Sequence, residues 1–284
     1  MHELVKYVMR GPKQAILLAS ISVLIPMMFW FGAATIALVT LRQGFRQGLV
    51  VFIWAVIPAL GWWFSLQDPG ALIVLFMSLV MASILRYTVS WQGTLAAGGV
   101  ISLVTGLLAP HIMPELIDML MEMGEVMLQE LAKNAPEDYD TTLDGAFRSL
   151  MIASFAASFY GMAVASVFLA RSWQSRLFNP GGWQEEFHQM RLSPRFIIGI
   201  ALIVMIAPSL NIEPALVMMI TAIPLLVCGL ALVHGVIGKK KLGGQWIFGL
   251  YVSAFILFPT VLILLVVLAL LDSLVNFRSR IQAS

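Results

Sequence analysis

The sequence predicts an all-α fold, a polytopic transmembrane helix bundle with about 8–10 membrane-inserted helices. Two observations carry this prediction. Of the 284 residues, 60% are hydrophobic and only 11% are charged, whereas a soluble domain carries roughly a quarter charged residues. The apolar residues also gather in eight continuous runs. No packing could cover this much apolar surface against water, so we expect a single integral membrane domain over residues 1–284.

The eight apolar runs supply the inserted helices. Most of them are close to the roughly 20 residues that a spanning helix needs. The first and the last are longer, and each contains a proline, Pro26 and Pro259. Proline removes a helix hydrogen bond and clashes with the preceding turn, so each long run is either one tilted helix or a hairpin of two short helices. The runs are approximately 14–41, 50–64, 71–85, 94–112, 149–170, 196–210, 214–238 and 246–271.

The basic residues favour the hairpins. Cytoplasmic loops near membrane ends collect Lys and Arg. With hairpins, only Lys133 and Arg148 fall outside, which leaves 15 of the 17 basic residues inside. With two long tilted helices, both termini move outside and the split falls to 10 inside and 7 outside. We therefore expect a multi-pass protein of the bacterial inner membrane with both termini in the cytoplasm.

The segment 113–147 is predicted to be an external, acidic, amphipathic loop. Pro114 opens a helical pattern that runs to about Lys133. Nine acidic residues lie between Glu115 and Asp144, against one lysine. An acidic connection of this kind suits the outer side of the membrane.

The segment 171–195 is predicted to be a cytoplasmic loop with a short surface helix. It contains the polar stretch FNPGGWQEEFHQMRLSP, which begins with a turn signal at 179–182. Apolar residues then recur at helical spacing, and two arginines that can meet anionic headgroups follow them. These features predict a docking surface rather than a catalytic loop, with its apolar side chains turned to the membrane or to the helix bundle. Its residues are Trp183, Phe187, Met190, Arg191 and Arg195.

A stripe of small residues predicts close helix packing in the run 149–170. The residues repeat every fourth position, a spacing that lets a second helix approach. The partner helix is either in this chain, with Gly98, Gly99 and Gly106 as the opposing surface, or in a second protein or second copy. The stripe is formed by Ala153, Ala157, Gly161 and Ala165.

No residue pattern in the sequence predicts catalysis. The six middle runs contain no Asp, Glu, Lys or Arg, which disfavours proton-coupled transport. We expect no enzyme activity, no catalytic or metal-binding residues, no cofactor and no nucleic-acid partner. Two polar residues remain as candidates for ligand or polar contacts, namely His234 inside an apolar run and Asp272 at the end of the last run.

Several strings resemble the YybS-like family of bacterial multi-pass membrane proteins, whose function is uncharacterised. They are the first run with its central Pro26, the exit LRQGFRQG at 41–48, the stretch FNPGGWQEEFHQMRLSP and the ending LLDSLVNFR at 270–278. That family is distantly similar to the S components of energy-coupling-factor vitamin transporters. The resemblance implies a bundle of short helices that holds a small ligand and binds a partner within the membrane.

Three functions are compatible with these features. The first is a small-ligand-binding or transport subunit, which would take a small hydrophobic or vitamin-like ligand. The alternative is a non-catalytic scaffold or assembly factor that binds a protein partner in the lipid bilayer. A membrane enzyme acting on lipid is the least favoured, because the polar residues that catalysis needs are missing.

Overall fold

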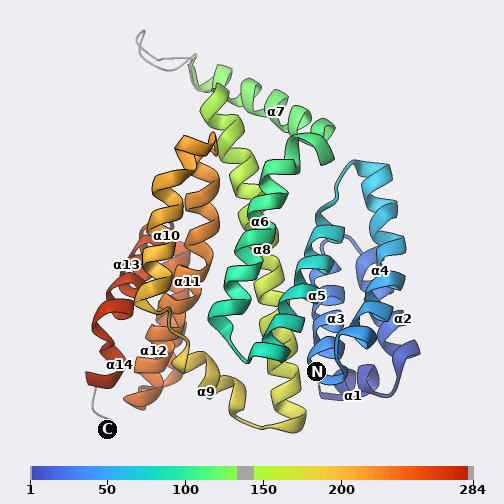
Figure 1. Cartoon of the computed structure of the whole chain (residues 1–284), viewed down its shortest axis with the longest axis vertical. Coiled ribbons are helices and arrows are strands. Elements are labelled where there is room, and N and C mark those ends of the chain that lie inside the picture. Colours follow the sequence, from blue (N-terminus) through green and yellow to red (C-terminus); the bar gives the residue numbers. More distant parts are fainter. Residues whose placement is uncertain (1, 133–143, 281–284) are drawn as a thin grey trace. The chain divides into compact units, whose positions relative to one another are not determined.

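The computed structural model describes residues 2–132 and 144–280, which form fourteen α-helices and one 3-10 helix, with no strand in those ranges (Figure 1). The predicted all-α membrane bundle is therefore confirmed. Five helices are long and apolar enough to cross a membrane, and a sixth span is possible if the bent pair α9 and α10 counts as one. The five are Phe45–Leu66, Gly70–Thr88, Trp91–Ile112, Phe147–Phe178 and Pro214–Lys239.

Contacts divide the chain into two compact units. The N-terminal unit comprises Met1–Trp173 together with Ala207–Ile220, and the C-terminal unit comprises Gln174–Ile206 together with Thr221–Ser284. Helices α8 and α11 contribute to both. The single membrane domain expected over residues 1–284 stays a prediction.

The N-terminal unit is organised around α3, which packs against α2, α4 and α5. Every residue of α3 from Gly32 to Leu41 is buried. The helices of this unit are α1 (His2–Met9), α2 (Pro12–Leu24), α3 (Phe29–Gln43), α4 (Phe45–Leu66), α5 (Gly70–Thr88), α6 (Trp91–Ile112), α7 (Pro114–Ala132), the first part of α8 (Asp144–Phe178), the 3-10 helix η1 (Ala207–Leu210) and the start of α11 (Pro214–Lys239).

Both long apolar runs break at their proline, as the hairpin interpretation predicts. The first run stops at Leu24 and resumes at Phe29, and its two helices pack so closely that a Cβ on Gly32 would lie 2.9 Å from the Ala19 carbonyl oxygen. The last run stops at Ile256 and resumes at Thr260. These breaks confirm the short helices, whereas the cytoplasmic position of the termini stays a prediction.

Small residues let α6 and α8 pack closely. The face of α8 that makes this contact differs from the predicted one. Ser102 Oγ donates a 2.8 Å hydrogen bond to the Ala156 carbonyl oxygen, and a Cβ on Gly98 would lie 2.4 Å from the Tyr160 ring. A Cβ on Gly106 would lie 2.4 Å from Leu216 of α11 and 3.3 Å from Ala156 of α8, while Gly99 faces Ile220. Two of the three glycines that were expected to oppose α8, Gly98 and Gly106, therefore contact it.

The predicted stripe on α8 follows this contact only at its start. Ala153 and Ala157 are buried, Gly161 is half-buried and Ala165 is exposed. A four-residue repeat drifts by about 40° per step around a helix of 3.6 residues per turn, so the three steps from Ala153 to Ala165 turn the stripe by about 120° and take it off the contact face. The buried face instead alternates steps of three and four residues and consists of Ala153, Ala156, Tyr160, Ala163 and Val167.

Helix α7 occupies the stretch where an amphipathic helix was predicted. Met113, just before it, and Ile117 are buried, and Gly124 packs against the Phe147 ring of α8. Residues 133–143 of the predicted 113–147 loop lie outside the described residues. Its external position stays a prediction.

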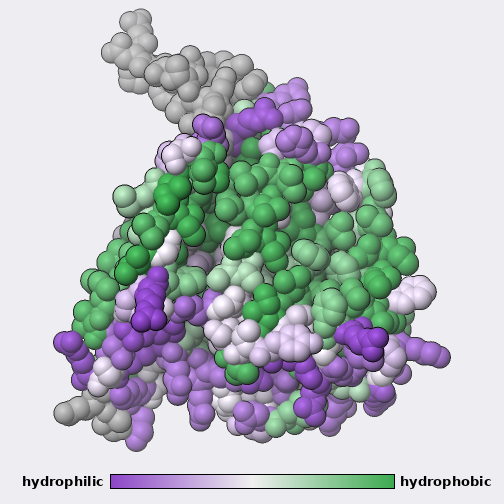
Figure 2. All heavy atoms as spheres, viewed as in Figure 1, coloured by the Kyte–Doolittle hydropathy of each residue, from purple (hydrophilic) through white to green (hydrophobic). Residues whose placement is uncertain are grey.

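The C-terminal unit has apolar side chains along the sides of its helices and hydrophilic side chains at one end. Large apolar side chains such as Met205 and Phe255 are exposed along its helices, as expected for lipid-facing surfaces. Figure 2 shows hydrophilic side chains gathered where α9 and α14 lie. Besides the end of α8 and most of α11, the unit contains α9 (Gly182–Gln189), α10 (Pro194–Ile206), α12 (Gly244–Ile256), α13 (Thr260–Val275) and α14 (Phe277–Arg280).

Candidate ligand-binding site

The short helix predicted in the polar stretch is present as α9. Gly181 has φ +88°, the left-handed conformation that glycine adopts without strain. Ser175 Oγ donates to the Asn179 carbonyl oxygen at 2.7 Å and accepts from the Trp183 amide at 3.0 Å. These bonds fix the turn and the start of α9 against the end of α8.

The apolar side chains of α9, which were predicted to turn to the membrane or to the helix bundle, pack within the C-terminal unit. The Trp183 and Phe187 ring centroids lie 5.5 Å apart, and the Phe187 ring stands edge-on to the His234 ring of α11 at 5.4 Å. Met190 is buried, whereas Arg195 is exposed. The apolar face of α9 is therefore directed toward α11 of the same unit.

His234, a candidate for a polar contact, is held by two neighbours. Its Nδ1 lies 2.9 Å from the Leu230 carbonyl oxygen, and its Nε2 lies 3.4 Å from the Tyr251 hydroxyl. Because a carbonyl oxygen can only accept, Nδ1 carries a proton. The ring stacks edge-on between Phe187 and Tyr251, so His234 links α9, α11 and α12.

Two glycines of α11 form a notch for His188. A Cβ on Gly235 would lie 2.8 Å from the His188 carbonyl oxygen, and a Cβ on Gly238 would lie 2.6 Å from its ring carbon Cε1. A larger residue at Gly235 would meet the α9 backbone and push it away from α11, whereas one at Gly238 would displace the His188 ring. The Gly-x-x-Gly spacing at 235–238 is the sequence signal for this notch, and it was not among the predicted features.

Asp272 lies at the centre of a buried ionic cluster. It is 2% exposed, at the end of α13. Its Oδ2 lies 3.9 Å from Arg191 Nε and 3.7 Å from Arg278 Nε, and its Oδ1 accepts from the Phe277 amide at 2.9 Å. Arg191 also donates to the carbonyl oxygens of Asp272 and Ser273, at 2.8 Å and 2.7 Å. The cluster joins the α9–α10 connection to the end of α13.

Arg278 extends the cluster to α9 and α11. It donates to the His188 carbonyl oxygen at 2.8 Å and to the Cys228 carbonyl oxygen at 3.5 Å. Burial lowers the pKa of its guanidinium, while Asp272 opposes that shift. Because arginine keeps its charge in proteins, two cations share one carboxylate here. The cluster carries an excess positive charge.

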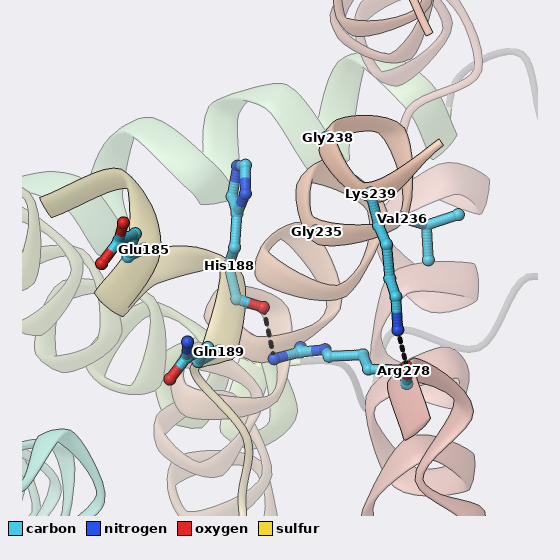
Figure 3. Close-up of a pocket in the computed structure, with 8 residues that line it drawn as sticks. All are labelled: Glu185, His188, Gln189, Gly235, Val236, Gly238, Lys239 and Arg278. Atoms are coloured by element: carbon cyan, nitrogen blue, oxygen red, sulfur yellow. Dashed lines mark hydrogen bonds between the residues drawn. The ribbon is translucent and has the colours of Figure 1, made fainter. Parts of the chain in front are cut away.

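A pocket of about 410 Å³ adjoins this cluster (Figure 3). We call it the polar pocket because five of its eight lining residues are polar or charged. The His188 ring points along α11 toward Gly238, and Lys239 Nζ donates to the Arg278 carbonyl oxygen at 2.8 Å. Burial lowers the pKa of His188, and His234 and Arg278 lower it further, so the imidazole is neutral at pH 7. The lining residues are Glu185, His188, Gln189, Gly235, Val236, Gly238, Lys239 and Arg278.

An apolar groove of about 690 Å³ shares one lining residue, Val236, with the polar pocket. Helices α11, α12 and α13 supply nearly all of its walls, and carbon atoms form most of its surface. Trp246 stands in the wall and is 56% exposed. Among its other lining residues are Leu232, Val233, Leu242, Gly249, Leu250 and Leu268.

Within residues 2–132 and 144–280 no group of three or more His, Cys, Asp or Glu side chains is placed to hold a metal ion. Comparison of the chain with family models, with curated proteins and with solved structures finds no match. The resemblance to the YybS-like family therefore stays a prediction.

Proposed function

We propose that this protein is a non-catalytic ligand-binding protein of the membrane. In this proposal the C-terminal unit holds one small amphiphilic ligand, with its polar end in the pocket and its apolar end in the groove. The observation that carries the proposal is that Val236 lines both cavities. A site with one polar and one apolar compartment suits a ligand with one end of each kind.

The packing of α9 favours ligand binding over the scaffold alternative. A scaffold that docks a partner through α9 would need its apolar side chains on a free face. Phe187 instead contacts His234, and Met190 is buried.

The charge bias of the sequence supports a cytoplasmic position for the pocket, because the basic residues around it belong to the loops that are predicted to lie inside. A role as the binding subunit of a transporter is the wider function that such a site would serve.

Native mass spectrometry of the purified protein tests this proposal. We expect the wild type to carry a small-molecule adduct, and Gly249→Leu to lose most of it. Gly249 lines the groove, and nothing lies within 4 Å of a Cβ built on it, so a leucine there fills the groove without disturbing the helices.

The matched control is Gly199→Leu, on α10. This glycine also has nothing within 4 Å of an added Cβ and does not line the groove, so the adduct should remain. The proposal fails if the wild type is bare, or if Gly249→Leu keeps the adduct at the wild-type level. A protein partner in place of a small molecule would support the scaffold alternative.

A further inference from the structure

We infer that the ligand is an anionic phospholipid of the surrounding membrane, with its phosphate in the polar pocket and an acyl chain in the apolar groove. This assignment names the ligand class of the proposed binding site and rests on that proposal. It is carried by three features of the C-terminal unit: the charge of the hydrophilic end, the donors that the pocket presents, and the form of the groove.

The hydrophilic end of the unit is strongly basic. The one buried carboxylate there, Asp272, is already paired with two arginines, so it does not offset the other cations. The remaining acidic groups in the neighbourhood are Glu185 and Glu186 of α9. Basic pockets at the membrane surface attract anionic headgroups. The basic residues at this end are Arg191, Arg195, Lys239, Lys240, Lys241, Arg278 and Arg280.

The pocket presents donors suited to one phosphate. Lys239 is exposed and uses one of its three ammonium hydrogens on the Arg278 carbonyl oxygen. The neutral His188 ring can donate one hydrogen bond from a second wall. Glu185, the only acidic lining residue, can accept from a headgroup hydroxyl. A phosphodiester with a hydroxylated headgroup meets all three groups.

The groove favours a lipid over a free phosphate. From Gln245 to Ser253 its α12 wall runs about 12 Å at 1.5 Å per residue, a length that an acyl chain can follow. Trp246 is exposed in that wall, and tryptophan is typical of the headgroup level. A free phosphate would occupy the polar pocket and leave this apolar surface unused.

Melting of the delipidated protein in neutral detergent, with added lipids of one acyl composition, tests the assignment. We expect phosphatidylglycerol to raise the melting temperature, and phosphatidylcholine or inorganic phosphate to leave it nearly unchanged. Lys239→Gln should weaken the response to phosphatidylglycerol about fivefold, which corresponds to roughly 1 kcal/mol for one basic residue near an anionic headgroup. Lys13→Gln, the same exposed change in the N-terminal unit, should respond as the wild type does.

Each other outcome overturns the assignment in a distinct way. Equal shifts with the two lipids would mean that the headgroup charge is not recognised, while an adduct in mass spectrometry would keep the ligand-binding proposal. An equal shift with inorganic phosphate would make the ligand a free anion. A full response of Gly249→Leu to phosphatidylglycerol would exclude the groove. An unchanged response of Lys239→Gln would exclude the pocket.

Discussion

Asp272→Asn will destabilise the C-terminal unit by about 3–5 kcal/mol, the range found when one partner of a buried ion pair is removed. The asparagine oxygen can still accept from the Phe277 amide, so the loss comes from the charge. Arg278, with a side chain 15% exposed, would keep a buried cation without its carboxylate. Arg191 is 28% exposed and contributes less, because water screens it more.

Thermal melting in detergent measures this loss. Glu185→Gln is the matched control, since it also converts a carboxylate to an amide but at an exposed position. The double variant Asp272→Asn with Arg278→Gln should lose less than the sum of the two single variants, because the second change removes the cation that the first leaves unpaired. Additive losses, or an Asp272→Asn melting temperature equal to that of Glu185→Gln, would show that the ion pair does not hold this unit together.

Gly229→Ala will separate α11 from α13. A Cβ on Gly229 would lie 2.2 Å from the Leu265 carbonyl oxygen and 2.8 Å from its carbonyl carbon. Backbone atoms cannot rotate away as the end of a side chain can, so the two helices have to move apart. Overpacking a tight interior typically costs about 1–3 kcal/mol and occasionally more, and the rigid backbone here places this variant at the upper end.

Gly199→Ala is the control for this change. It lies inside α10 of the same unit, and nothing is within 4 Å of an added Cβ. Alanine favours a helix over glycine by about 1 kcal/mol, so Gly199→Ala should melt at or above the wild-type temperature. If Gly229→Ala melts at the same temperature as Gly199→Ala, α11 and α13 do not pack as closely at Gly229 as described.

Local chemistry explains which parts of the fold could be predicted from sequence. The breaks at Pro26 and Pro259 were predicted from the excess length of the two runs, the proline in each and the bias of the basic residues. Proline alone does not decide a break in this chain, because Pro58, Pro110 and Pro224 lie inside continuous helices. Helix α7 and helix α9 follow from helical periodicity and from the turn residues before α9. None of these predictions depends on which distant segment packs against the helix.

The parts that could not be predicted depend on distant neighbours. Arg191 and Asp272 are 81 residues apart in the chain, and no local pattern pairs them, although Asp272 alone was a candidate for a polar contact. In the sequence, the glycines of α11 at 229, 235 and 238 look like ordinary glycines of a membrane helix. Their role becomes visible only in the structure, where α13 and His188 pack against them. On α8, Ala165 belongs to the predicted stripe, yet the contact face turns away from it.

A density map of the protein in a lipid disc that contains phosphatidylglycerol would test the central claim most directly. We expect a phosphate density between His188 and Lys239, continuous with a chain density in the groove beside Gly249. The claim would be contradicted by a map in which lipid surrounds the protein while the pocket holds only solvent and the groove is closed by side chains.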